Sequence, residues 1–195
     1  VEGVHLLAHS RGSALLLNAL RELGIEIISA GVNPKEALKL ENVVLMAPDI
    51  DMDVANQQMQ VFASDPDRFT HWPGQRVPQF LKGRWTIYSS PEDKALFVSR
   101  FLFRSRARVG QMSLAETTSQ GHEHYTKWGK LDLIVYQGKR TDLFGHSYFL
   151  SNPQVSSDLI HLIRYGTSAG APGRPLVRIS PLAWTFPGSK FASTE

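Results

Sequence analysis

Hydrophobic residues along the chain gather in short runs, and turn residues followed by apolar residues at helical spacing come after several of these runs. Short apolar runs of this kind are typical of strands buried in a parallel sheet that helices cover. The pattern therefore predicts an α/β fold. The four predicted strands cover residues 4–9, 43–47, 84–88 and 131–136.

The helices are predicted from the spacing of apolar residues and from residues that favour helix ends. The first helix follows the first strand, and Gly24 is its expected stop because glycine adopts the left-handed conformation common after helices. A polar stretch from Asp51 is expected to start a second helix. Ser90 followed by Pro91 favours the start of a third helix. The expected helices begin near Ser13, Asp51, Ser90 and Asn152, and the last ends at Tyr165.

The chain after Gly166 differs in composition from the rest because it is dense in glycine, proline and serine. Such segments form few regular elements, so we expect this tail to be extended or disordered. A chain of 195 residues is long enough for one domain with a substantial core. We therefore expect a single domain over residues 1–166 and a tail over residues 167–195.

Composition excludes several function classes. The net charge is only +3, and no block of basic residues is interleaved with aromatic residues, so no nucleic-acid partner is expected. The absence of cysteine excludes disulfides and thiol catalysis. No apolar run approaches the roughly 20 residues that span a bilayer, and no signal-peptide pattern opens the chain. We expect a soluble domain without an integral membrane segment, and the cytoplasm is favoured although the compartment stays open.

The segment AHSRG, residues 8–12, is the first candidate for chemistry. In a nucleophile elbow a serine occupies a sharp turn between a strand and a helix, and small residues flank it because the backbone is crowded there. Here Ala8 and Gly12 flank Ser10, which lies between a predicted strand and a predicted helix. A serine before a helix can equally be an N-cap, which would leave Ser10 without a catalytic role.

An acid that would accompany Ser10 has two main candidate positions. Asp49 and Asp51 follow the second predicted strand, and Asp93 follows the third. Each has a structural alternative, since Asp51 suits a helix cap and Ser90 with Asp93 matches a capping box. The two positions are nearly tied on the residues alone, and Asp142 ranks third.

Where a nucleophile elbow works with an acid and a histidine, the histidine follows the acid along the chain. Of seven histidines, His146 best meets this order, because it follows the fourth predicted strand and Gly145 allows a sharp turn. His161 lies on an amphipathic helix, where packing is the ordinary role. His122 and His124 flank Glu123 and form a weaker candidate for a metal-dependent hydrolase.

Four segments in this order, HLLAHSRG, VVLMAPDID, YSSPEDKALFVSR and GHSYF, resemble bacterial esterase- and lipase-like α/β-hydrolases of a family of unknown function. The resemblance covers residues 5–149 and implies an α/β-hydrolase fold in which a parallel sheet is flanked by helices. It implies Ser10 as the nucleophile, Asp93 as the acid and His146 as the base. It leaves the role of the APDID segment, with Asp49 and Asp51, undefined.

The activity that the resemblance implies is hydrolysis of a small-molecule ester without a metal or organic cofactor. The backbone N–H of Arg11 would be one donor to the oxyanion. A catalytically silent scaffold used for binding is the main alternative.

In the folds that the chain resembles, the nucleophile follows the fifth strand, so we expect earlier strands to lie outside this sequence. The strand at residues 4–9 would then be an apolar edge and a candidate surface for self-association. A second oxyanion donor would also be missing. We expect the 195-residue chain alone to aggregate, to pair this edge with another chain or to be a weak esterase.

Overall fold

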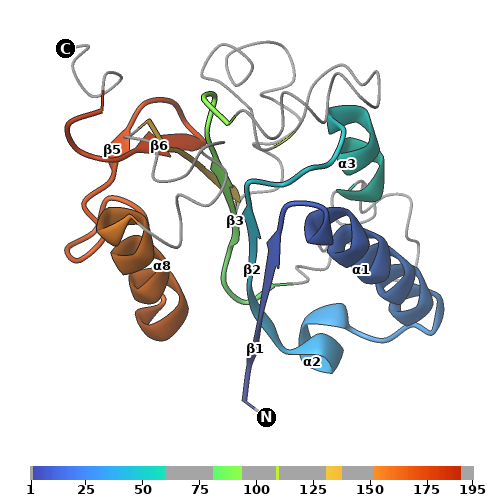
Figure 1. Cartoon of the computed structure of the whole chain (residues 1–195). Helices are drawn as coiled ribbons and strands as arrows, with labels where there is room; N and C mark the ends of the chain where they lie inside the picture. Colours follow the sequence, from blue (N-terminus) through green and yellow to red (C-terminus); the bar gives the residue numbers. More distant parts are fainter. Residues whose placement is uncertain (1, 60–80, 94–108, 110–130, 138–151, 190–195) are drawn as a thin grey trace.

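A computed structural model describes residues 2–59, 81–93, 109, 131–137 and 152–189 of the chain (Figure 1). The strands in these ranges are β1 (Val4–His9), β2 (Leu40–Met46), β3 (Trp85–Ser89), β4 (Leu131–Val135), β5 (Val177–Arg178) and β6 (Ala183–Thr185). The helices are α1 (Gly12–Ser29), α2 (Pro34–Leu38), α3 (Met52–Met59) and α8 (Pro153–Tyr165). None of these helices has the length and apolar character needed to cross a membrane.

The described strands form one six-stranded sheet in the order β1-β2-β3-β4-β6-β5. Every neighbouring pair from β1 to β6 is parallel, and β5 alone is antiparallel to its neighbour. Parallel neighbours require crossover connections, which accounts for helices on the faces of the sheet. The α/β architecture predicted from the sequence is confirmed.

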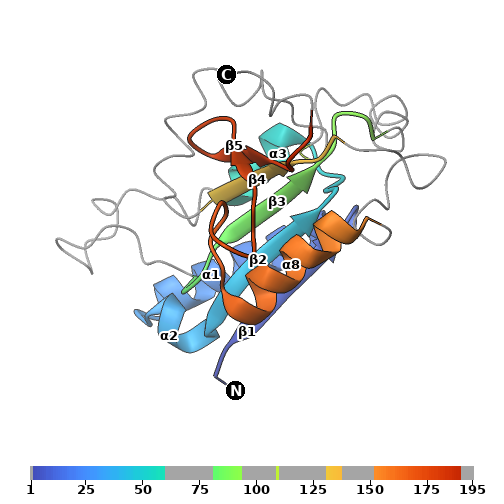
Figure 2. The ribbon, with the colours of Figure 1, turned by 90° about the vertical axis from the view of Figure 1, so that its left-hand side faces the viewer.

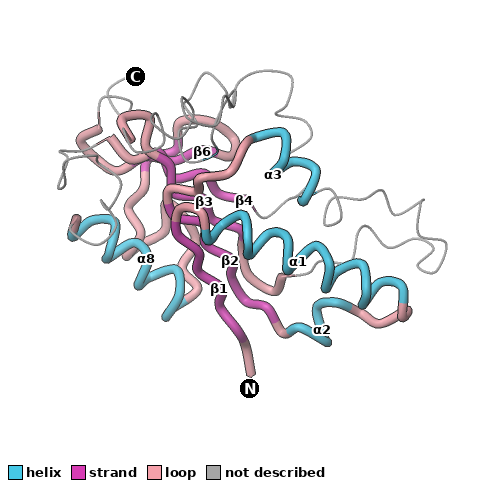
Figure 3. The backbone as a smooth tube through the Cα atoms, turned by 45° about the vertical axis from the view of Figure 1, so that its right-hand side comes forward, coloured by secondary structure: helices cyan, strands magenta, loops and turns pink. Residues whose placement is uncertain are grey.

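Helices cover the sheet from both sides. Helix α8 packs on one face, whereas α1, α2 and α3 lie on the other (Figures 1 and 3). Successive side chains of a strand point to opposite faces, so Val43 and Leu45 of β2 join the core beneath α1, and Val44 and Met46 join the core beneath α8. Burial on both faces explains why the central strands are mostly apolar and do not alternate between apolar and polar residues.

Strand β1 is the border strand of the described sheet and pairs with β2 there (Figure 2). It is less buried than the central strands, and the side chain of Leu7 is 48% exposed. Leu6 and Ala8 point to the opposite face and pack against the core beneath α1. The predicted strand at residues 4–9 is confirmed with identical bounds.

The helices differ from the prediction in two places. Helix α1 does not stop at Gly24, which is buried inside it, but continues to Ser29, and Gly31 follows with a φ of 68°. Apolar residues continue at helical spacing after Gly24, so packing outweighs the weak helix propensity of one glycine. Helix α2 was not predicted, although Asn33 caps it by accepting a 3.0 Å hydrogen bond from the Lys35 N–H and proline occupies its first turn.

The tail also differs from the expectation of an extended or disordered segment separate from the domain. Residues 167–189 supply β6 and β5. Ala183 is buried in the core beneath α1, and Leu176 and Phe186 are buried in the core beneath α8. Short strands and turns suit a sequence dense in glycine and proline, because both residue types end regular elements. Residues 190–195 lie outside the described part.

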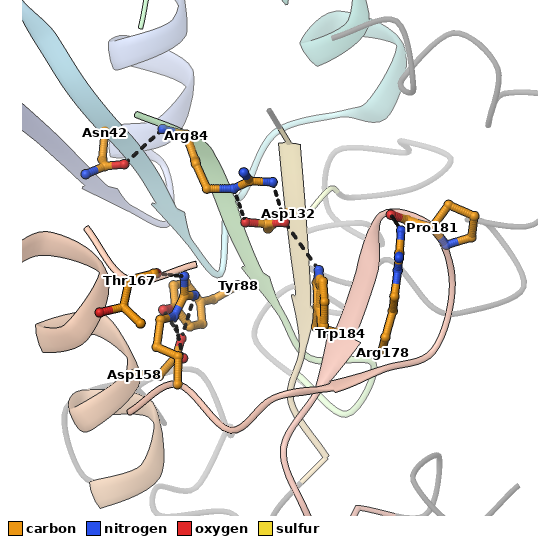
Figure 4. A network of polar contacts seen from close by, with 10 residues as sticks. Asn42, Arg84, Tyr88, Asp132, Asp158, Thr167, Arg178, Pro181 and Trp184 are labelled. Carbon is orange, nitrogen blue, oxygen red and sulfur yellow. Dashed lines mark hydrogen bonds and ion pairs between the residues drawn. The ribbon is translucent and has the colours of Figure 1, made fainter. Parts of the chain in front are cut away.

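A buried ionic network fastens this tail region, residues 167–189, to α8 and the sheet (Figure 4). The fully buried guanidinium of Arg174 donates to both carboxylate oxygens of Asp158, at 2.8 and 3.0 Å, and to the carbonyl oxygen of Thr167 at 3.0 Å. The Tyr88 hydroxyl donates to the same carboxylate at 2.5 Å. Burial and the adjacent carboxylate raise the pKa of Tyr88 well above its ordinary value.

A second carboxylate links strands β3, β4 and β6 (Figure 4). Asp132 of β4 accepts two hydrogen bonds from the guanidinium of Arg84 and one, of 3.2 Å, from the indole N–H of Trp184. The Asp132 carboxylate therefore belongs to the interior of the fold, while the Arg84 side chain is partly exposed.

Candidate active site

The carboxyl ends of the parallel strands meet at one edge of the sheet. Ser10 directly follows β1, Asp49 follows β2 and Asp93 follows β3. Backbone hydrogen bonds tie these strand ends together: the N–H groups of Ser10, Ala47 and Tyr136 donate to the carbonyls of Met46, Tyr88 and Ser89, at 3.0, 3.0 and 2.8 Å. In open α/β sheets, ligands bind outside this edge.

Ser10 forms the turn between β1 and α1 with an unusual backbone conformation. Its φ is 54°, in the left-handed region that costs a residue with a Cβ about 1–2 kcal/mol. The N-cap of α1 is Arg11, and no side chain caps this helix end. A capping serine would have extended backbone and accept a hydrogen bond from the helix. Ser10 therefore does not serve as the N-cap, and its strained turn needs another explanation.

Helix α1 directs its N-terminal end at this turn. The first N–H groups of a helix have no acceptor within the helix, and the peptide dipoles make this end positive. Arg11 is the residue between Ser10 and the helix, and the Ser13 N–H donates to the Ser10 carbonyl at 3.1 Å. The turn thus combines a serine with backbone N–H groups suited to a developing negative charge.

Asp49, one of the candidate acids, contacts the serine turn. Its backbone N–H donates to the Ser10 carbonyl at 3.1 Å. One carboxylate oxygen of Asp49 lies 3.5 Å from the Nε of Arg11. The Asp49 side chain is 8% exposed, whereas that of Arg11 is 69% exposed.

Asp51 has the structural role that the sequence left open. Its carboxylate accepts a 2.9 Å hydrogen bond from the Asp53 N–H at the start of α3. This contact satisfies a backbone donor that the helix itself leaves unpaired. Asp51 is therefore the cap of α3.

Asp93 lies in the turn that follows β3, and only 1% of its surface is exposed. Its backbone N–H donates to the backbone carbonyl of Ser90 at 3.1 Å, which closes the turn. A carboxylate buried to this extent is costly unless polar groups compensate it. The helix expected from Ser90 would extend into residues outside the described part.

The spacing of the strands sets the distance that a triad must bridge. β1 and β3 are separated by β2, so their ends lie about 10 Å apart at ordinary strand spacing. An imidazole with a hydrogen bond of about 2.8 Å on each side suits such a gap. His146, the expected base, lies outside the described residues, as do Asp142 and the candidate metal ligands His122, Glu123 and His124.

Two histidines within the described ranges have other contacts. The Nδ1 of His5 lies 3.1 Å from the side-chain nitrogen of Asn42, between β1 and β2. The His161 ring packs against Tyr165 on α8, with ring centroids 5.4 Å apart. The packing role expected for His161 agrees with this contact. Across the described ranges, no group of three residues has the arrangement of a metal site.

Sequence reasoning missed a polar contact at the same edge of the sheet. The amide nitrogen of Asn152 donates to the Tyr136 hydroxyl at 2.8 Å, while its oxygen accepts from the N–H groups of Gln154 and Val155. Burial raises the pKa of Tyr136, the hydrogen bond from Asn152 lowers it, and the charge of Glu92 raises it, with a net increase. Asn152 followed by Pro153 is a sequence signal for the N-cap of α8. No feature of the sequence predicts the hydrogen bond between Asn152 and Tyr136.

Comparisons with known proteins agree with this architecture. A family model described as "Alpha/beta hydrolase of unknown function (DUF900)" matches residues 1–164. Searches of curated proteins and of solved structures found no match. The mostly parallel sheet, the flanking helices and the family match lead to one assignment: the chain belongs to this family of α/β-hydrolases.

Proposed function

We propose that this α/β-hydrolase is a serine hydrolase that cleaves carboxylic esters through Ser10, His146 and Asp93. The observation that carries the proposal is the conformation of Ser10, which has a φ of 54° between β1 and α1 at the carboxyl edge of the sheet. Strained backbone of this kind clusters at functional sites. The serine also stands before the N-terminal end of α1, where an oxyanion would be stabilised.

The contacts of the two other candidate acids, Asp51 and Asp49, support the choice of Asp93. Asp51 caps α3, and Asp49 lies beside Arg11. Asp93 is buried one strand beyond Asp49, and ordinary strand spacing leaves room for an imidazole between it and Ser10. His146 follows β4 in the chain, so it can approach from the same edge of the sheet.

In this mechanism His146 accepts the proton of the Ser10 hydroxyl while the oxygen attacks the ester carbonyl. The π electron pair of the ester carbonyl moves to the carbonyl oxygen, and this oxyanion accepts a hydrogen bond from the Arg11 N–H. Collapse of the tetrahedral intermediate breaks the bond to the alcohol, and His146 returns the proton to it. Water then attacks the acyl-enzyme by the same steps and releases the acid. Asp93 orients the imidazole and stabilises its cation.

Substitution of the nucleophile and the base tests the proposal on a short activated ester. Ser10→Ala and His146→Ala should each lower kcat on the order of 10⁴- to 10⁶-fold, and the double variant should be no worse, because the two residues act as a unit. Ser29→Ala, at the exposed end of α1, is the matched control and should retain full activity. Full activity of Ser10→Ala in a folded protein would exclude the serine mechanism and favour a metal-dependent hydrolase, which a chelator would inhibit.

Replacement of the acid gives a separate test. Asp93→Asn should lower kcat by about two to four orders of magnitude, because the imidazole loses its orienting charge. The matched variant is Asp51→Asn, since asparagine caps a helix as well as aspartate does and kcat should not change. An Asp93→Asn variant that is folded and fully active would remove Asp93 from the triad.

A further inference from the structure

The last residue of β2 and the loop that follows it, residues 47–51, hold the backbone of Ser10 from both sides. The Ser10 N–H donates to the carbonyl of Met46 at the end of β2, and the Ser10 carbonyl accepts from the N–H of Asp49. Ala47 has a φ of 45°, a second left-handed residue that turns the chain sharply after β2. A strained turn persists only when its surroundings fix it, and this loop supplies such contacts.

The carboxylate of Asp49 adds a contact to the next residue along the turn. It is nearly buried and lies 3.5 Å from the Nε of Arg11, whose side chain is mostly exposed. An ion pair with one exposed partner contributes little to folding stability. The pair joins the side chain of Arg11 to the loop whose Asp49 N–H already bonds to the Ser10 carbonyl.

We propose that Asp49 is a positioning residue for the nucleophile turn. Its N–H holds the Ser10 carbonyl, and its carboxylate holds Arg11, so that the Arg11 N–H stays aimed at the oxyanion. This inference rests on the proposed serine mechanism, and it gives the first aspartate of the APDID segment a role distinct from that of a triad acid. Because the oxyanion forms only in the transition state, the contact acts on kcat rather than on KM.

The central test compares Asp49→Asn with the wild type on a neutral activated ester. Loss of an oxyanion donor costs about 10²- to 10³-fold, and here the donor remains but is less well aligned, so we expect kcat to fall about tenfold with KM unchanged. Arg11→Gln should give a similar loss, and the Asp49→Asn, Arg11→Gln double variant should be no worse than either single one. Arg11→Lys should restore part of the rate because a cation remains beside Asp49.

A pH profile separates positioning from a direct role on the base. The limbs of the kcat/KM profile report the titration of the essential acid and base, and they should stay in place in Asp49→Asn. Asp51→Asn serves as the control in the same loop and should match the wild type in rate and profile.

Three results would overturn the inference while Ser10→Ala remains inactive. An unchanged kcat in Asp49→Asn would show that the contact does not position the turn. A loss as large as that of Asp93→Asn, with a displaced pH profile, would make Asp49 the triad acid. A rise in KM confined to anionic esters in Arg11→Gln would assign the arginine to substrate binding. Activity retained in Ser10→Ala would instead reject the proposed function itself.

Discussion

At the β1 border of the sheet the chain turns through Ser10 with strained backbone and leaves Leu7 48% exposed, whereas the tail region buries the guanidinium of Arg174 completely. Around Ser10, backbone hydrogen bonds from the neighbouring loop hold the turn. In the tail region, charged side chains hold short strands and turns to α8. The candidate nucleophile Ser10 therefore follows β1, the less buried strand at the border of the sheet. The tail region, although its sequence is more polar, is held by a deeply buried ion pair.

The largest effect on stability is expected from removal of the cation in the tail anchor. Arg174→Met leaves the carboxylate of Asp158 buried without its charged partner, and such losses cost about 3–5 kcal/mol. Urea unfolding should show this decrease in the free energy of unfolding. Arg178→Met is the matched control, because Arg178 is exposed and bonds to carbonyls of its own turn, and it should cost less than about 1 kcal/mol. Equal stabilities of the two variants would show that Arg174 does not anchor the tail.

A smaller effect is expected from Tyr88, which donates to the same carboxylate. Tyr88→Phe should lower the free energy of unfolding by about 1–3 kcal/mol at neutral pH, because a buried acceptor loses a donor. The raised pKa of Tyr88 means that the folded protein retains this proton at pH values where the unfolded chain releases it. Stability should therefore be fully present below the ordinary tyrosine pKa of about 10 and fall as the pH rises above it.

Unfolding measurements between pH 7 and 11 check how the free energy of unfolding changes with pH. The decrease above pH 10 should be smaller in Tyr88→Phe than in the wild type, because the substituted residue no longer titrates. The same slope in both proteins would mean that Tyr88 contributes nothing to it.

The smallest effect is expected at the contact between β4 and α8. Asn152→Ser keeps an oxygen that can cap α8 but loses the donor to Tyr136, so we expect a loss of about 1 kcal/mol. Asn152→Ala also loses the cap and should be less stable than Asn152→Ser by about another 1 kcal/mol. Thermal unfolding ranks the three proteins, and equal melting temperatures for serine and alanine would show that Asn152 does not function as a cap.

The contrast between the two regions also explains which elements could be predicted from the sequence. Around Ser10, a short apolar run is followed by a turn and then by apolar residues at helical spacing, which is a clear signal for a strand, a turn and a helix. The four predicted strands correspond to β1, β2, β3 and β4. Helix α1 passes its predicted stop at Gly24 because tertiary packing decides helix ends more strongly than one glycine. The strand ends also bring Ser10, Asp49 and Asp93 to one edge of the sheet, which follows from chain order in any parallel sheet.

The tail region could not be predicted in the same way. Its anchors are Arg174 and, in the preceding parts of the chain, Asp158 and Tyr88, and a charged residue in a polar segment is usually exposed. Pairing across 16 and 70 positions has no periodic signal. The left-handed backbone of Ser10 and Ala47 is likewise a property of the folded loops, since neither residue type signals a positive φ.

Covalent labelling with a fluorophosphonate, followed by mass-spectrometric mapping of the adduct, tests directly whether Ser10 is a nucleophile. The intact protein should gain one adduct per chain on the peptide that contains Ser10, with loss of ester hydrolysis in proportion to labelling. Ser29→Ala should label like the wild type, and Ser10→Ala should not label. A folded protein that hydrolyses esters while Ser10 stays unmodified, or one that carries its adduct on another residue, would show that Ser10 is not the nucleophile.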